Sequence, residues 1–184
     1  MVFTIPESLS KKLYPVSWLL GAWQGKGVLA EDSKDYKEFD IAMDFSDNKQ
    51  NLKYNAKIIY QTKTFLSEKG FLEVLGSLDN RDILPDELKT DKTTPFWKLT
   101  WKLNNSHNYK TNYLGWVSNG RMEFNSESIL NSNKLTDVLA SKRMIGYIKG
   151  DLYYAWDLAT KPKIQTTDKT KLKSYISAVL NKKD

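Results

Sequence analysis

The feature that most constrains the fold of this chain is a glycine-rich segment near its N-terminus, which reads GAWQGKG over residues 21–27. Trp23, Gly25 and Gly27 alternate along this segment, so in a β-strand they share one face. A glycine weakens a strand unless a bend, a bulge or the close approach of a backbone or ligand needs the missing side chain. The approaching group is either a neighbouring strand of a closing barrel or a ligand. Both interpretations imply a barrel.

The segments that follow have the pattern of half-buried strands. Along residues 36–45, Phe39, Ile41, Met43 and Phe45 alternate with polar or small side chains. Further strand-like segments separated by polar turns occupy residues 52–64, 65–78, 96–103, 113–117, 121–129, 135–148 and 152–158. Many short strands without an amphipathic helix in the body predict an all-β fold, a single antiparallel up-and-down barrel whose closure removes exposed sheet edges.

The length of 184 residues fits one domain with its own core. We expect residues 1–12 to be a loose leader and residues 13–184 to be the barrel domain, with a short helical or irregular plug at 13–20. Residues 79–95 form the one long connection, with a helical turn around 85–88. It is interpreted as a surface insertion, with a lid over the barrel mouth as the alternative.

The residue content excludes most conventional catalysis. The chain has no cysteine, which excludes disulfides, thiolate zinc sites and a cysteine nucleophile. Its single histidine, His107, lies in a polar turn, where we expect an exposed side chain and neither a catalytic base nor a metal ligand. No metalloprotease, nucleophile-elbow or phosphate-loop motif is present. The aromatic residues suit a cavity for a small apolar ligand, although they can equally fill the barrel themselves.

The net charge of +6 is concentrated at the C-terminal end. Residues 161–184 hold seven lysines and two aspartates, a net of +5, which leaves +1 for residues 1–160. We interpret this segment as a solvated end and expect no nucleic-acid partner, because it lacks arginine and a recognisable binding module. No secretory signal and no membrane span are found in the sequence, so we expect a cytoplasmic protein without a membrane partner.

The GAWQGKG segment resembles the GxWxGxG signature of the nitrobindin family, in which Gly21, Trp23, Gly25 and Gly27 are the motif positions. Members of that family are antiparallel barrels related in shape to fatty-acid-binding proteins and lipocalins, and the better-known ones hold haem b. Further similarity lies in residues 67–72, 149–160 and 171–180, so the resemblance covers most of the chain from residue 13 onward. It implies a barrel of about ten strands.

At one position the chain departs from the family in a way that bears on function. The family's closing motif begins with a histidine that is the proximal ligand of the haem iron, followed by an aliphatic residue, any residue, alanine, any residue and leucine. The matching residues here are Tyr175, Ile176, Ser177, Ala178, Val179 and Leu180. After the signature, the family's cleft-forming segment is replaced by one with Glu31 and Asp32, whose charges would oppose a dianionic cofactor. The resemblance therefore implies that the iron ligand has been lost.

Three functional hypotheses follow. The first is a nitrobindin-like barrel without family-type haem binding, which holds a small hydrophobic ligand near Trp23, Tyr154, Trp156 and Tyr175. Because tyrosine can ligate ferric iron, the second is a ferric haem b protein with Tyr175 as axial ligand, which binds nitric oxide or isomerises peroxynitrite. The third is a nucleic-acid-binding protein with a basic tail.

Overall fold

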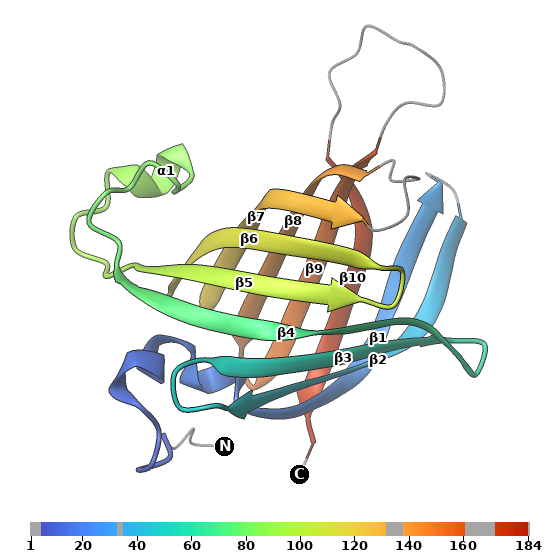
Figure 1. Ribbon diagram of the computed structural model, residues 1–184, viewed down its shortest axis with the longest axis horizontal. Helices are drawn as coiled ribbons and strands as arrows, with labels where there is room; N and C mark the ends of the chain where they lie inside the picture. The colour runs from blue at the N-terminus through green and yellow to red at the C-terminus, as the bar shows by residue number, and fades with distance from the viewer. Residues whose placement is uncertain (1–4, 33–34, 132–137, 161–171, 184) are drawn as a thin grey trace, which may run out of the picture.

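The structure is a computed structural model that describes residues 5–32, 35–131, 138–160 and 172–183. Its ten strands form one closed antiparallel barrel, in which each strand pairs with the next and β10 pairs with β1 (Figure 1). The strands are β1 (Gly21–Asp32), β2 (Asp35–Asp47), β3 (Leu52–Tyr60), β4 (Lys63–Ser77), β5 (Trp97–Asn105), β6 (Tyr109–Ser118), β7 (Arg121–Asn131), β8 (Val138–Ile148), β9 (Asp151–Thr160) and β10 (Lys173–Lys182). The all-β fold and the ten-stranded barrel are confirmed.

The up-and-down order gives the barrel two distinct ends. At one end, the mouth, β1 ends, β10 begins, and the β3–β4 and β5–β6 turns lie. The other end, the base, holds the β2–β3 and β4–β5 connections and both ends of the described chain (Figure 1). The 3₁₀ helix η1 (Lys11–Leu19) closes the base with the buried side chains of Leu13, Val16 and Leu19. This is the expected plug, and Leu9 is also buried in the core.

The glycine signature joins the two ends of the sheet. Gly25 pairs with Leu180 and Gly27 with Ala178 across the β1–β10 contact. A Cβ atom on Gly25 would collide with the carbonyl oxygen of Val179, and one on Gly27 would lie 2.7 Å from the carbonyl oxygen of Ser177. Of the two interpretations of the motif, the structure shows the approach of a neighbouring strand. These glycines let the barrel close.

The long connection between β4 and β5 packs on the outside of the barrel at the base (Figure 1). Its Leu84 belongs to a small apolar cluster with Phe96 and Trp116, and the guanidinium of Arg81 lies 5.0 Å from the ring centroid of Phe96. The expected helical turn is α1 (Asp86–Lys89). The connection does not lie over the mouth, so the surface interpretation holds.

The predicted boundary between the strands at 52–64 and 65–78 is wrong, because β3 ends at Tyr60 and β4 begins at Lys63. The segment 52–64 breaks at Gln61 and Thr62, which have φ values of 48° and 66° and form the turn between β3 and β4. Neither residue is a glycine, asparagine or proline, the residues that usually mark such turns. The sequence therefore carried no turn signal at this point.

The interior of the barrel is filled by large side chains. Fully buried residues include Trp23, Tyr54, Trp101, Tyr113, Phe124 and Arg143. Several of these rings contact one another, as Trp101 does with Tyr54 at 4.8 Å between ring centroids. Much of the aromatic content that suits a cavity is thus used as core.

Candidate functional site

A polar cluster centred on Arg143 lies inside the barrel. Only 1% of Arg143 is exposed. Its Nη1 and Nη2 donate hydrogen bonds to Oε2 and Oε1 of Glu68, each at 2.7 Å. Nη1 also donates to the hydroxyl of Tyr154 at 2.8 Å, and Nε donates to the hydroxyl of Tyr113 at 2.9 Å. Strands β4, β6, β8 and β9 each contribute one of these four residues, so the cluster ties the barrel walls together.

Burial sets the charge states in this cluster. Burial by itself lowers the pKa of Arg143, but the charge of Glu68 more than offsets this effect and raises the pKa above its ordinary value. Burial raises the pKa of Tyr154 despite the opposing charge of Arg143. The guanidinium therefore stays charged and the Tyr154 phenol stays neutral at physiological pH. Arg143 is also 4.0 Å from the ring centroid of Trp156, a cation–π contact.

A second set of hydrogen bonds fixes the indole of Trp156. Its Nε1 donates to Oγ of Ser141 at 2.8 Å, and the same Oγ lies 2.7 Å from the hydroxyl of Tyr113. On the mouth side, the ring of Tyr175 meets the ring of Trp156 edge-on, with 5.1 Å between centroids and an interplanar angle of 90°. Trp156 thus contacts both Arg143 and Tyr175.

A cavity of about 140 Å³ lies at the mouth beside these two rings. It brings together Tyr175 and Trp156, two of the residues predicted to bind a ligand. The complete lining is Leu66, Asn105, His107, Tyr109, Thr111, Tyr113, Ile129, Val138, Ser141, Arg143, Trp156, Leu158 and Tyr175. We call this space the mouth cavity. Tyr175 belongs to the lining of this cavity and not to that of the outer groove described below.

The other two predicted ligand-binding residues lie elsewhere. Trp23 is at the base, opposite Lys182 of β10, and its Nε1 donates to the carbonyl oxygen of Leu19 at 2.7 Å. Tyr175 precedes Lys182 by seven residues in β10, so it lies roughly 23 Å away along the strand at about 3.3 Å per residue. Tyr154 contributes its hydroxyl to the Arg143 cluster and does not line the mouth cavity. The structure therefore separates Trp23 and Tyr154 from Tyr175.

His107 shares the mouth cavity with Tyr175, which sequence reasoning missed. The side chain is exposed, as expected, and its ring packs edge-on against Phe65 with 5.9 Å between centroids. A usable signal was present, because alternate connections of an up-and-down barrel lie at the same end. Counting strands places the β5–β6 turn at the same end of the barrel as the start of β10.

Sequence reasoning also missed the Arg143 cluster. In β8, Ser141, Arg143 and Ile145 are buried and face the interior. A charged residue at an inward position of a strand is costly unless it is paired. That position was the signal that a buried carboxylate partner existed, although it did not identify Glu68.

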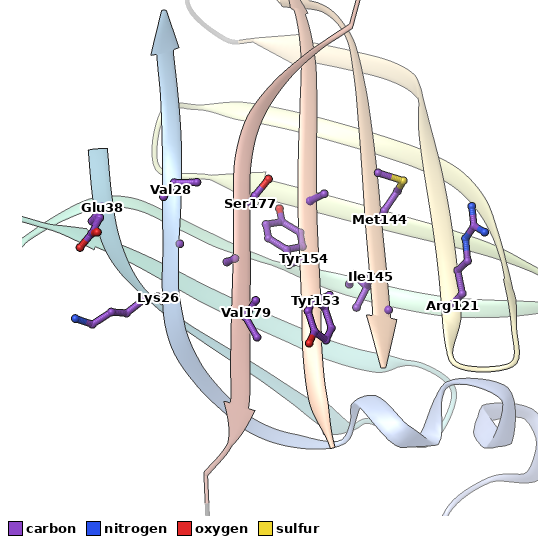
Figure 2. Close-up of a pocket in the computed structure, with 14 residues that line it drawn as sticks. Lys26, Val28, Glu38, Arg121, Met144, Ile145, Tyr153, Tyr154, Ser177 and Val179 are labelled. Carbon is purple, nitrogen blue, oxygen red and sulfur yellow. The ribbon is translucent and has the colours of Figure 1, made fainter. Parts of the chain in front are cut away.

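A separate groove of about 660 Å³ lies on the outer face of the barrel across β1, β10, β9 and β8. Val28, Val179, Tyr153 and Met144 contribute side chains to it (Figure 2). Small residues at neighbouring positions make the sheet surface hollow there. The groove lies outside the closed barrel and does not reach the mouth cavity.

Several predictions fall on residues that the structure does not describe. The side chains of Glu31 and Asp32, and most of the lysine-rich segment after residue 160, lie outside the described part of the chain. The charge-repulsion argument and the nucleic-acid hypothesis therefore stay predictions. Within the described ranges, no cluster of three or more histidine or acidic side chains is arranged to hold a metal ion. No described helix is long and apolar enough to cross a membrane.

Comparisons with known proteins agree on the type of barrel. Residues 12–182 match the family described as "THAP4-like, heme-binding beta-barrel domain". A peroxynitrite isomerase of Renibacterium salmoninarum is 26% identical over an alignment of 209 positions, which covers 99% of this chain and 94% of that protein. A peroxynitrite isomerase of Leifsonia xyli subsp. xyli is 26% identical over an alignment that covers 84% of this chain and 89% of that protein. The crystal structure of Rv2717c from M. tuberculosis superimposes with a TM-score of 0.71 over 96% of this chain and all of that one, at 18% identity.

Proposed function

Because the chain belongs to the family of THAP4-like, heme-binding β-barrel domains, we propose that it is a nitrobindin-like binding protein whose mouth cavity holds a small, largely apolar ligand in place of haem. One observation carries this proposal. Where the resemblance implies the iron-binding histidine, Tyr175 packs edge-on against Trp156, and the space left beside the two rings is about 140 Å³. The proposal is a binding function and not a catalytic one.

The size of the mouth cavity argues against a haem. Sites for drug-sized ligands have volumes of about 300–1,000 Å³, and a porphyrin belongs to that size class or above it. The mouth cavity has about 140 Å³. The indole of Trp156 limits it, and the hydrogen bond to Ser141 and the contact with Arg143 hold that indole in place. A porphyrin could enter only if this indole moved away.

Titration of the purified protein with hemin tests the proposal. We expect no saturable Soret band from the native chain and no rise in its melting temperature. In the Trp156→Ala variant the obstacle is removed, so any affinity for hemin should increase relative to the native chain. A saturable Soret band from the native chain that disappears in Tyr175→Phe would contradict the proposal. Tyr153→Phe, an exposed tyrosine on the outer face of β9, is the matched control.

Ferric haem binding is the second candidate function. The relatives named peroxynitrite isomerase favour it, as does the presence of both His107 and Tyr175 at one cavity. Imidazole nitrogen and phenolate oxygen are both known ligands of haem iron. For this function the indole of Trp156 has to leave its position between Ser141 and Tyr175. The same titration decides between the two candidates, with His107→Ala as a further variant.

A further inference from the structure

The mouth cavity has a size and a set of polar groups that define a ligand class. We infer that it selects one six-membered aromatic ring carrying a single uncharged hydrogen-bond acceptor. The inference rests on the proposed small-ligand function and makes it specific. Four features of the cavity support it: volume, wall chemistry, unused hydrogen-bond donors and local charge.

The volume corresponds to one ring. The cavity has about 140 Å³, and an engineered apolar protein cavity of about 150 Å³ binds benzene. A bicyclic or longer ligand therefore does not fit without displacement of the walls. Since Trp156 is held by hydrogen bonding and a cation–π contact, this wall resists displacement.

The walls favour an aromatic ligand over an aliphatic one of the same size. Trp156 and Tyr175 contribute rings, and Leu66, Ile129 and Leu158 contribute apolar surface. Aromatic rings gain about 0.5–1.5 kcal/mol from edge-to-face or offset contacts beyond the area they bury. The ring planes of Trp156 and Tyr175 are at 90° to each other, so the cavity presents both a ring edge and a ring face to a ligand.

Two of the hydrogen-bond donors that line the cavity, on Arg143 and Thr111, are buried and have no acceptor among the described residues. A guanidinium has five N–H groups. Four of those of Arg143 are used by Glu68, Tyr154 and Tyr113, and one on Nη2 has no acceptor among the described residues. Thr111, which is only 8% exposed, lines the same cavity, and its hydroxyl makes no hydrogen bond within the described chain. An acceptor on the ligand would satisfy these donors.

The local charge favours a neutral acceptor. Glu68 already compensates the positive charge of Arg143 through two hydrogen bonds. A ligand carboxylate would lose its hydration without gaining an uncompensated cation, and burial of an unpaired charge is costly. Carbonyl, nitrile or ether groups avoid that cost. The ligand class is therefore a neutral monocyclic aromatic compound with one acceptor.

Three probes of similar size test this class by calorimetric titration of the full chain. Benzonitrile has a ring and a neutral acceptor, phenylacetylene has the same shape without the acceptor, and benzoate has a negative charge. We expect benzonitrile to bind about fivefold more tightly than phenylacetylene, the effect of one hydrogen bond, and benzoate to bind most weakly. Quenching of tryptophan fluorescence should accompany binding because Trp156 lines the cavity.

Two variants locate the binding site and its donor. Thr111→Val keeps the side-chain shape and removes the hydroxyl, so the preference for benzonitrile over phenylacetylene should fall. Ile129→Phe fills the cavity and should abolish binding of both probes, with the fold checked by circular dichroism. Ser177→Ala, an exposed hydroxyl on the outer face of β10, is the control and should change neither affinity.

The outcomes separate this inference from the function on which it rests. Equal affinities for benzonitrile and phenylacetylene, or tightest binding of benzoate, overturn the acceptor class and leave a small-ligand function in place. Failure of both neutral probes to bind overturns the inference. A saturable Soret band with hemin overturns the proposed function itself.

Discussion

Glu68 and Arg143, which lie 75 residues apart in the sequence, join across the barrel interior through two parallel hydrogen bonds of 2.7 Å. Both residues are buried, at 7% and 1% exposure. Removing two charges from water is expensive, and their attraction compensates for this only when the geometry is good and other polar groups are satisfied. Here Tyr113 and Tyr154 accept further hydrogen bonds from Arg143. The pair therefore depends on all four strands being in register.

Removal of one partner should destabilise the fold strongly. We expect Glu68→Gln to lower the free energy of unfolding by about 3–5 kcal/mol, because it leaves Arg143 charged and uncompensated. The measurement is urea denaturation followed by tryptophan fluorescence. Glu73→Gln, which breaks an exposed ion pair with Lys12, should lower the free energy of unfolding by only about 0–1 kcal/mol. Replacement of both partners, as Glu68→Leu with Arg143→Met, should cost less than Glu68→Gln. A larger loss in the double variant would contradict this account.

Two buried tyrosines should respond in opposite ways to loss of the hydroxyl. The hydroxyl of Tyr54 has no hydrogen-bond partner among the described residues, so Tyr54→Phe should be neutral or slightly stabilising. Tyr154 accepts a hydrogen bond from the charged Arg143, so Tyr154→Phe should lower the free energy of unfolding by about 1.5–3 kcal/mol. Thermal and urea unfolding of the two variants provide the comparison. Equal effects would show that the unpaired hydroxyl has a partner.

Closure of the barrel should be sensitive to a single methyl group on β1. In Gly25→Ala the new Cβ would collide with the backbone of β10 at Val179. We expect this overpacking to lower the free energy of unfolding by about 1–3 kcal/mol. Gly146→Ala is the matched control, because a Cβ there has no heavy atom within 4 Å. It should be neutral or stabilising, since alanine is favoured over glycine by about 0.5–1 kcal/mol inside a strand. Similar melting temperatures for the two variants would be inconsistent with the close contact.

Acid stability should depend on Glu123, which faces outward on β7 beside Arg121 and Lys142. Burial alone raises the pKa of this carboxyl, but the hydrogen bond from Lys142 at 2.9 Å and that from Arg121 outweigh it and lower the pKa below its ordinary value of 4.5. A carboxyl whose pKa is lowered in the folded state stabilises the protein at pH values above its unfolded-state pKa. This stabilisation is lost as the pH falls through the folded-state pKa.

The Glu123 contribution is measured as unfolding free energy against pH. In Glu123→Gln, the loss of stability on acidification below about pH 4.5 should be smaller than in the native chain. Glu127→Gln removes an exposed carboxylate from the same strand and is the control. Identical pH profiles for the native chain and Glu123→Gln would show that this ion-pair cluster adds nothing to acid stability.

The barrel was predictable from the sequence, whereas the interior was not. Period-two alternation, as at Phe39 and Ile41, shows which side chains face inward, because it depends only on strand geometry. It does not show which inward residue meets which, and the pairing of Glu68 with Arg143 depends on register across several strands. The cavity volume depends further on the side-chain position of Trp156, which is set by its hydrogen bond to Ser141. Tyr175 and Trp156 were both predicted to bind a ligand, whereas the place of His107 at the same cavity was not predicted.

An even number of strands in an up-and-down order returns the chain to the end from which it started. The first strand therefore begins, and the last one ends, at the base, about as far from the cavity as the barrel allows (Figure 1). A purification tag, fluorescent protein or surface tether attached through the C-terminal side of β10 would leave that opening facing solution. Immobilised in this way, the protein would keep the mouth cavity accessible, so the titrations with the three aromatic probes and with hemin could be carried out on a surface.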